Sequence, residues 1–280
     1  MAIQRKTSDS TVKVALVQRH ATPNRDENLE RGIAAFKEAA RKRVQLVVFA
    51  ELAFQPFFPQ KPRDLDTSPW AETIPGPTTD RFSQLAKHFG IVTVINLYEK
   101  DGACTYDSSP VIDAGGELLG TTRMLHIMDG PCFHERDYYT PGNTGAPVYR
   151  TAVGKLGVAI CYDRHYPEYM RALGIKGAEI VVVPQAGAVD EWPPGLYEAE
   201  LQVASMQNGY FCALANRVGK EECLMFAGES FVTDPFGQVI CRAPKGKDSV
   251  LYADLDLSRI ADSPARTHFM KDRRPDIYPL

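Results

Sequence analysis

The sequence lacks any apolar segment long enough to cross a membrane. Its longest apolar runs, such as Ile180 to Val183, fall far short of the roughly 20 residues that a membrane helix needs. A surplus of basic residues is also absent, because 32 Lys and Arg residues are outnumbered by 35 Asp and Glu residues. With a formal net charge of -3, no overall positive field favours binding to nucleic acid or to an anionic membrane.

Cysteine is present, but its spacing does not indicate a metal site. The six cysteines form no CxxC pair and no short Cys/His pairing of the zinc type. His126, His134 and Glu135 are close in sequence, but they do not form an HxH or HExxH pattern. Residues 1–10 lack the apolar core of a signal peptide, and we expect them to form a flexible N-terminal arm. We therefore expect reduced thiols in a cytoplasmic protein, and neither a metal ion nor an organic cofactor.

Strand-like and helix-like segments alternate along the rest of the chain. Short apolar runs predict strands, and apolar residues at helical spacing predict helices. The predicted strands are 12–18, 45–49, 91–97, 106–113, 179–184, 211–216, 228–233, 239–243 and 249–254, and the predicted helices are 28–42, 78–89, 167–176 and 197–207. This order fits one doubly wound sheet, or two mixed sheets flanked by helices, in a single α/β domain over residues 11–265. Residues 266–280 are basic, contain proline and form a C-terminal tail.

A thiol and a carboxylate each follow an apolar, strand-like run. Cys161 comes after the run 156–160, and Glu51 comes after the run 46–50. A free thiol with a pKa near ~8.5 is only a few per cent ionised at neutral pH, so a nucleophilic cysteine needs a proton acceptor. Burial raises the pKa of a carboxyl group toward the range in which it can act as that acceptor. Cys161 is therefore the candidate nucleophile and Glu51 the candidate general base.

Three stretches resemble the nitrilase superfamily of carbon–nitrogen hydrolases, over nearly the whole chain. They are Leu46 to Phe54, Arg123 to Glu135 followed by Tyr138 to Gly142, and Lys155 to Glu168. The resemblance implies a four-layer α-β-β-α sandwich and a catalytic triad of Glu, Lys and Cys, supported by a second Glu. Glu51 and Cys161 match the triad, and Glu135 matches the supporting position. The resemblance also implies a homo-oligomer, a dimer or larger, in which the tail 266–280 packs on a partner subunit.

The sequence departs from the family at the lysine. The family lysine stands two residues before a histidine in a motif resembling Arg-Lys-x-His, and here Met124 takes its place between Arg123 and His126. A thioether carries no positive charge, and losing one oxyanion donor typically costs on the order of 10²–10³ in rate. Three explanations remain open. Arg123, Arg164 or His126 supplies the charge from another position, the lysine was replaced to trap a complex, or the chain is a binding protein with a vestigial site.

The residues after the nucleophile indicate a substrate class. Cys161-Tyr-Asp-Arg-His-Tyr-Pro-Glu168 resembles the branch that hydrolyses N-carbamoyl compounds, in which an Arg three residues beyond the Cys can bind a substrate carboxylate. Arg164 stands at that offset, although an ion pair with Asp163 or Glu168 is the structural alternative.

Further candidates surround the same segment. His165 and Gln185 are candidates for binding substrate, and the backbone N–H of Tyr162 is a candidate for the oxyanion hole. We predict hydrolysis of a small N-carbamoyl (ureido) molecule to amine, ammonia and carbon dioxide. The alternatives are an aliphatic amidase or nitrilase of the same superfamily, and a catalytically silent binding protein.

Overall fold

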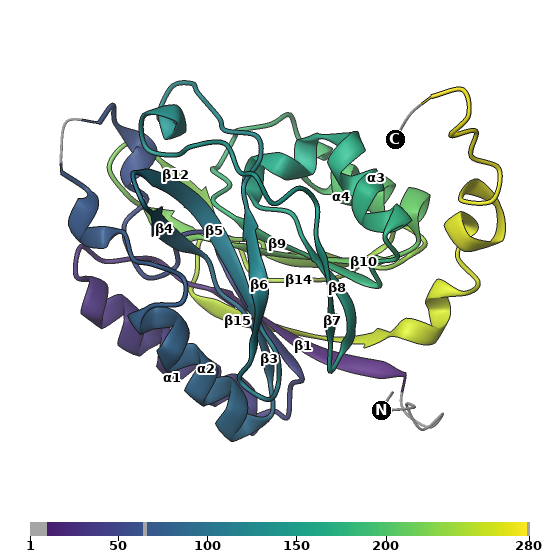
Figure 1. The fold of residues 1–280 in the computed structure, drawn as a ribbon, viewed down its shortest axis with the longest axis horizontal. Coiled ribbons are helices and arrows are strands. Elements are labelled where there is room, and N and C mark those ends of the chain that lie inside the picture. The colour runs from purple at the N-terminus through teal and green to yellow at the C-terminus, as the bar shows by residue number, and fades with distance from the viewer. Residues whose placement is uncertain (1–9, 64–65, 279–280) are drawn as a thin grey trace.

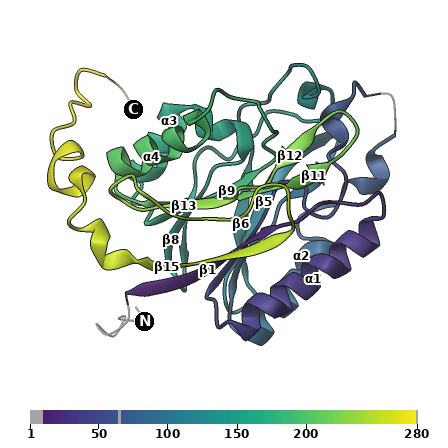
Figure 2. The same cartoon turned by 180° about the vertical axis from the view of Figure 1, so that it is seen from behind.

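Two β-sheets lie face to face, and a pair of helices covers the outer face of each (Figures 1 and 2). This computed structural model describes residues 10–63 and 66–278. Helices α1 (Arg25–Arg41) and α2 (Pro77–Phe89) cover one sheet, and α3 (Pro167–Ile175) and α4 (Leu196–Asn208) cover the other. The four-layer α-β-β-α sandwich is therefore confirmed, and the single doubly wound sheet is excluded.

The first sheet is mixed. Its strand order is β15-β1-β2-β3-β5-β4, with β6 paired to β5. Strands β1, β2 and β3 are parallel, and the remaining pairs are antiparallel. The bounds are β1 Thr11–Gln18, β2 Leu46–Phe49, β3 Val92–Val94, β4 Leu97–Asp101, β5 Cys104–Ile112, β6 Leu118–Arg123 and β15 Ser249–Asp256.

The second sheet is also mixed, with three parallel strands at its centre. Its order is β14-β13-β10-β9-β8-β7, and β8, β9 and β10 run parallel. The bounds are β7 Val148–Thr151, β8 Gly154–Val158, β9 Ile180–Gln185, β10 Phe211–Asn216, β13 Phe231–Thr233 and β14 Val239–Arg242. A separate hairpin joins β11 (Val218–Lys220) to β12 (Met225–Ala227).

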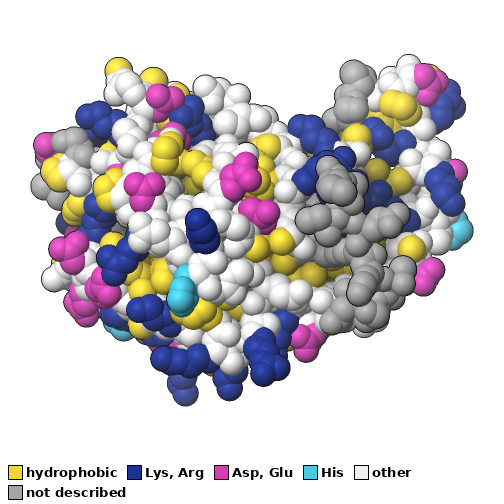
Figure 3. All heavy atoms as spheres, turned by 60° about the horizontal axis from the view of Figure 1, so that its bottom comes forward, with side chains coloured by type: hydrophobic (Ala, Val, Ile, Leu, Met, Phe, Trp, Pro, Cys, Tyr) yellow, Lys and Arg dark blue, Asp and Glu magenta, His cyan; other side chains and the backbone are white. Residues whose placement is uncertain are grey.

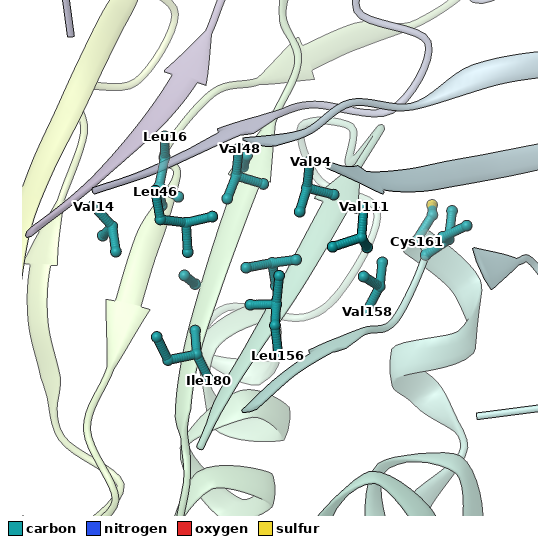
Figure 4. Close-up of a cluster of buried hydrophobic side chains, with 14 of the residues drawn as sticks. Val14, Leu16, Leu46, Val48, Val94, Val111, Leu156, Val158, Cys161 and Ile180 are labelled. Atoms are coloured by element: carbon teal, nitrogen blue, oxygen red, sulfur yellow. The ribbon is translucent and has the colours of Figure 1, made fainter. Parts of the chain in front are cut away.

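Three apolar layers hold the sandwich together, one between each pair of neighbouring layers. Along β1, Val14 and Leu16 face the second sheet, whereas Ala15 and Val17 face α1 and α2, because successive side chains of a strand point to opposite faces. The layer between the sheets contains Val48, Leu156 and Ile180 and extends to Cys161 at one end (Figure 4). The core between the sheets therefore leads directly to the candidate nucleophile.

The predicted single strand 91–97 is wrong, and a buried side chain explains why. Residues 91–97 form two strands, β3 and β4, because the chain turns at Asn96. The buried Asn96 side chain accepts a hydrogen bond from the Leu52 N–H at 2.7 Å and donates to the carboxylate of Asp107. The predicted strand 228–233 also starts late, at Phe231, because Gly228 and Glu229 have φ angles of 71° and 53°. The pattern analysis missed β6, β7, β11 and β12, which are short or only partly buried.

The structure describes the predicted arm and tail only in part. Most of the predicted N-terminal arm, residues 1–9, lies outside the described residues. The described part of the C-terminal tail runs past α3 and α4 (yellow in Figure 1), where the Met270 sulfur accepts a hydrogen bond from Arg171 Nη1 at 2.9 Å. None of the described helices is both long and apolar enough to cross a membrane. On the face seen in Figure 3, Lys and Arg side chains lie among Asp and Glu side chains.

Truncating the layer between the sheets should destabilise the protein. Leu156 is fully buried there, so Leu156→Ala should lower the free energy of unfolding by about 2–5 kcal/mol through lost burial and a residual cavity. Chemical denaturation measures this change. Leu196→Ala is the matched control, because Leu196 is 48% exposed on α4 and its truncation should cost less than about 1 kcal/mol. Equal losses in the two variants would contradict this account of the core.

Candidate active site

The carboxyl ends of parallel strands bring the candidate residues together. Cys161 follows β8, Gln185 ends β9, and Val158 pairs with Val182 in parallel register. Glu51 follows β2 in the facing sheet, two residues beyond its last residue. Figure 4 shows Cys161 just past Val158, at the end of the apolar layer between the sheets. Two strand ends from one sheet and one from the other therefore converge on a single buried point.

Cys161, the candidate nucleophile, has a strained backbone conformation. Its φ of 42° is unusual for a residue with a side chain, and conformations of this kind cost on the order of 1–3 kcal/mol. Cys161 begins a 3₁₀ helix, Cys161–His165, which turns the thiol away from the strand direction. The buried Gln185 side chain donates from Nε2 to the Cys161 sulfur at 3.3 Å, and the backbone N–H of Ala186 also hydrogen-bonds to it. These donors favour the thiolate.

Glu51 is fully buried beside the thiol of Cys161, and its charge raises the pKa of that thiol. Its backbone is fixed by Arg217, whose Nη1 donates to the carbonyl oxygens of Glu51 at 2.9 Å and Leu52 at 2.5 Å. Arg217 is 1% exposed and forms an ion pair with Glu221. The sequence analysis did not identify Arg217 as a site residue. Its position directly after a buried strand end, at Asn216, was the available signal.

Glu135 lies on a short helical turn, Glu135–Asp137, and is also fully buried. Its Oε2 accepts a hydrogen bond from the backbone N–H of Met128 at 3.1 Å, whereas Oε1 has no hydrogen-bond partner. The carboxyl group of Glu135 is close enough to Glu51 that its charge raises the pKa of Glu51. The structure therefore brings Glu51, Glu135 and Cys161 together, as the resemblance implied.

A third buried carboxyl group joins this cluster, and the sequence analysis missed it. Asp107 lies within β5, is 1% exposed and lies next to the side chain of Glu51, whose pKa its charge raises. The Asn96 side chain donates a hydrogen bond to it. A carboxylate inside a strand that was predicted to be buried was the signal that could have identified Asp107.

Burial changes the protonation of all these groups. It raises the pKa of Glu51 well above the usual range, and the neighbouring charges of Asp107 and Glu135 raise it further. Burial likewise raises the pKa of Asp107 to about 7 and that of Glu135 well above its usual range. The pKa of the Cys161 thiol is raised well above normal by burial and then by the charges of Glu51 and Glu135. The resting thiol is therefore neutral and needs a base to ionise it.

The structure does not bring Arg123 or His126 to the thiol. Arg123 donates to Glu99 from Nε at 2.8 Å, forms an ion pair with Asp101, and lies over the Tyr106 ring. The His126 ring stacks on Tyr166 with centroids 3.4 Å apart, and its Nδ1 lies 2.7 Å from Asp163 Oδ1. Met124 is buried, and its backbone N–H donates to the Asp107 carbonyl at 2.9 Å.

The short helix after Cys161 places three further candidates. The Tyr162 ring packs against His165, and His165 Nδ1 contacts Glu200 at 2.7 Å. The Arg164 side chain is fully buried, and its Nη1 donates to the Tyr197 carbonyl and pairs with Glu200, both at 3.1 Å. The expected alternative of an ion pair between Arg164 and Asp163 or Glu168 is therefore not the pairing seen.

Arg164 keeps free donors beside the site. Its Nε and Nη2 are buried without a hydrogen-bond partner, and its guanidinium lies 4.7 Å from the centre of the Tyr197 ring. Residues three apart in a 3₁₀ helix eclipse one another, so Arg164 and Cys161 lie on one face of their helix. The Tyr197 hydroxyl is also buried and unpartnered, and Tyr197 lines a cavity of about 210 Å³ beneath residues 188–195.

The arrangement suits acyl transfer through a thiol. A nucleophile, an adjacent buried carboxyl group and backbone and side-chain donors converge within one apolar enclosure. Among the described residues, no group of His, Cys, Asp and Glu side chains has the geometry to hold a metal ion.

The chain matches a family and several characterised relatives over nearly its full length. The family described as "Carbon-nitrogen hydrolase" matches residues 13–265. An N-carbamoylputrescine amidase from Oryza sativa subsp. japonica is 34% identical, over 96% of this chain and 94% of that protein. A citrullinase from Francisella tularensis is 31% identical, over 96% of this chain and 97% of that protein.

Solved structures show the same fold. A carbon-nitrogen hydrolase from Helicobacter pylori G27 superposes with a TM-score of 0.88 at 30% identity, covering 96% of this chain and 97% of that one. A variant of an amidase from Nesterenkonia superposes with a TM-score of 0.80 at 26% identity, covering 95% of each chain. In that variant, the acetamide moiety of fluoroacetamide is covalently added at the active site cysteine.

The buried carboxyl groups should make stability fall as pH rises. Because Glu51 holds its proton more tightly in the folded state than in the unfolded chain, its protonated form stabilises the fold. That contribution is complete below pH ~4 and is lost as pH rises through the folded-state pKa. In Glu51→Gln the loss should be smaller, so the free energy of unfolding should fall less between pH 4 and pH 8 than in the unmodified protein. Urea denaturation across this range measures both slopes.

A surface glutamate provides the control. Glu30→Gln removes an exposed carboxylate that pairs with Arg81, and it should leave the slope of stability against pH unchanged. A Glu51→Gln protein that keeps the full slope of the unmodified protein would contradict the buried titration.

Proposed function

Because the chain belongs to the carbon–nitrogen hydrolase family, we propose that it hydrolyses an N-carbamoyl (ureido) compound to an amine, ammonia and carbon dioxide. The observation that carries this proposal is the buried contact between Glu51 and the Cys161 thiol, at the meeting point of two sheets. Two relatives whose names specify ureido substrates, N-carbamoylputrescine and citrulline, support the choice of a carbamoyl group.

The first half of the reaction forms a carbamoyl thioester. Glu51 accepts the Cys161 proton while the sulfur attacks the ureido carbon. The tetrahedral oxyanion accepts a hydrogen bond from the backbone N–H of Tyr162, and Glu135 orients the leaving nitrogen. Glu51 then returns the proton to that nitrogen, which leaves as ammonia. The thiol proton has by then moved to ammonia, and the carbon is bonded to sulfur.

The second half releases the amine. Glu51 takes a proton from water, the hydroxide attacks the thioester carbon, and the sulfur leaves and recovers its proton from Glu51. The product is a carbamic acid, which loses carbon dioxide to give the free amine. The same carboxyl group serves as base and acid twice, and the raised pKa that burial gives it favours both its protonation and its return of the proton.

We further propose that Arg164 binds a carboxylate on the substrate. A guanidinium with one edge free matches the two oxygens of a carboxylate, and Arg164 has Nε and Nη2 buried without a partner. Its remaining contacts, to Glu200 and the Tyr197 carbonyl, hold it in place. Gln185 and His165 lie beside the thiol and beside Glu200, where they complete the binding surface. This favours N-carbamoyl acids over N-carbamoyl amines.

Each of two alternative functions is supported by one specific observation. An amidase acting on a simple aliphatic amide is favoured by the superposition on the Nesterenkonia amidase. A catalytically silent binding protein is favoured by Met124, which supplies no charge where the family has a lysine.

We also propose that the chain forms a homo-oligomer, a dimer or larger. The tail 266–280 packs on a second copy of the chain in this assembly. Phe269, Ile277 and Tyr278 support it, because they are large apolar residues that are 42%, 69% and 44% exposed in the single chain.

Product analysis tests the reaction. The unmodified protein should release equal amounts of ammonia and carbon dioxide from at least one N-carbamoyl acid, in a panel that also contains N-carbamoyl amines, aliphatic amides and nitriles. Cys161→Ala should lower the rate by at least about 10³-fold, because the nucleophile is lost. Cys212→Ala, which removes a buried thiol on β10 away from the site, is the control and should keep the activity.

The other outcomes identify the alternatives. Ammonia without carbon dioxide would establish an amidase or nitrilase. If the unmodified protein releases no ammonia but Met124→Lys does, the methionine disables an otherwise assembled site. If neither protein releases ammonia, a binding role is favoured.

Arg164 should decide selectivity between acids and amines. Arg164→Met should raise the KM for an N-carbamoyl acid by roughly 10–100-fold and leave that for the matching N-carbamoyl amine within about threefold, since only the acid loses a charged partner. The double variant Arg164→Met/Glu200→Met repeats the measurement without leaving Glu200 unpaired. Arg171→Met removes a neighbouring arginine on α3 and serves as the control. Equal changes for acid and amine would refute the role of Arg164.

A further inference from the structure

Two of the buried carboxyl groups face each other with no donor between them. Both oxygens of Glu51 and the Oδ2 of Asp107 are buried without a partner among the N–H and O–H groups of the described residues. The two side chains nevertheless lie next to each other, because each acts directly on the pKa of the other. Ionised carboxylates only accept hydrogen bonds, so this contact is satisfied only when a proton lies between them.

Asn96 decides which oxygen of Asp107 takes part. The Asn96 Oδ1 accepts from the Leu52 N–H at 2.7 Å, so its Nδ2 must point toward Asp107 as a donor. That donor reaches Asp107 Oδ1. Asp107 Oδ2 is left to contact Glu51. The same asparagine therefore holds both the residue after Glu51 and the carboxyl group that faces Glu51.

Three described arginines around the site form ion pairs with carboxylates outside this cluster, although Arg164 keeps two donors without a partner. Arg123 pairs with Glu99 and Asp101, Arg164 pairs with Glu200, and Arg217 binds backbone carbonyls and Glu221. Ser108 pairs with Arg123 in the antiparallel register of β5 and β6, and the Met124 N–H continues that ladder to the Asp107 carbonyl. Met124 therefore lies directly across from Asp107, on the same face. An uncharged side chain faces the carboxyl pair where the family would have an ammonium group.

We propose that Glu51 and Asp107 form a carboxyl pair that shares one proton, and that Asp107 acts through Glu51 as a positioning residue in place of a lysine. This inference rests on the proposed function. The shared proton lowers the charge of the pair from two to one, which reduces the cost of burying it. Burial also raises the pKa of both groups, as such sharing requires.

The number of protons on the pair and on Cys161 can be followed through each step of the reaction. In the resting site the pair carries one proton and Cys161 carries another. The thiol proton moves to the pair as sulfur attacks the substrate carbon, so the pair then carries two. One of these protons leaves with ammonia, and the pair returns to one. A second cycle with water repeats these transfers, so the pair is never required to lose its last proton.

Other titratable groups surround the pair from several elements. None of them hydrogen-bonds to Asp107 Oδ2. These groups are Cys161 and Asp163 on the helix after β8, Glu135 and Tyr139 on and after the turn 135–137, and His126, which is bound to Asp163.

The dependence of kcat on pH tests the pair. With one shared proton required, the unmodified protein should show a bell-shaped profile whose acid and alkaline limbs both belong to the pair. Asp107→Asn keeps the shape and can donate from its amide, but it cannot titrate. Its profile should rise through a single acid limb, and the alkaline fall should move up by at least one pH unit or disappear. Asp107→Leu removes the donor as well, and its kcat should fall at least about tenfold below that of Asp107→Asn.

Met124→Lys provides an independent variant. An ammonium group across from Asp107 stabilises its ionised form, so it should split the pair and abolish the alkaline limb as Asp107→Asn does. Asp113→Asn, just beyond the end of β5, is the matched control and should reproduce the unmodified profile. An Asp107→Asn profile with both limbs unchanged would overturn the proposal, and so would equal kcat values for the Asn and Leu variants.

A second readout separates this proposal from the proposed function. The rate of Cys161 alkylation by iodoacetamide, followed by mass spectrometry of the Cys161 peptide from pH 5 to pH 10, needs no substrate. The plot of alkylation rate against pH should show two inflections from the pair in the unmodified protein. In Asp107→Asn it should show one inflection fewer. Loss of one inflection without turnover of any ureido compound would refute the function and keep the pair. Turnover with identical alkylation profiles would keep the function and refute the pair.

Discussion

The site depends on the burial of carboxyl groups beside a thiol, and no Lys, Arg or His side chain in the described part of the chain forms an ion pair with those carboxyl groups. Glu51, Asp107 and Glu135 are each no more than 1% exposed, and the charges that act most strongly on Glu51 are those of the other two. Buried charges without partners are costly, so these groups take up protons instead. A site of this kind holds protons ready for transfer at neutral pH, and it lowers the stability of the fold as those protons are lost.

The packing of the two sheets keeps these carboxyl groups and the thiol buried. Glu51 comes from one sheet and Cys161 from the other, and the apolar layer between the sheets ends where they meet. Arg217 reaches across from the end of β10 to hold the carbonyls of Glu51 and Leu52, so the loop after β2 cannot move away from the thiol. Strain at Cys161 is held by the same packing, because β8 and β9 fix the residues on both sides of the sulfur.

The sequence pattern located strands and helices, whereas the four-layer arrangement was implied by the family resemblance, because the pattern alone also allowed one doubly wound sheet. Alternating apolar runs and amphipathic helices located most of the strands and all four helices to within a few residues, because burial imposes a period of two on strands and of 3.6 on helices. Glu51, Glu135 and Cys161 could be selected because each lies in a motif with family flanks. The split of residues 91–97 at Asn96 could not, because its cause is a side-chain contact with Leu52 and Asp107 from other strands.

By itself, the sequence identified the candidate nucleophile, its candidate base and the methionine at the position of the family lysine, since these are properties of single positions. Only the tertiary structure decided what surrounds them. It turned Arg123 toward Glu99 and Asp101, paired His126 with Asp163, and brought Asp107 from the middle of β5 against Glu51. The physical reason is that adjacent residues of a strand point to opposite faces, so neighbours in sequence are separated while residues 56 apart meet. Charge compensation in a buried site is a property of that three-dimensional neighbourhood, and the order of residues along the chain does not contain it.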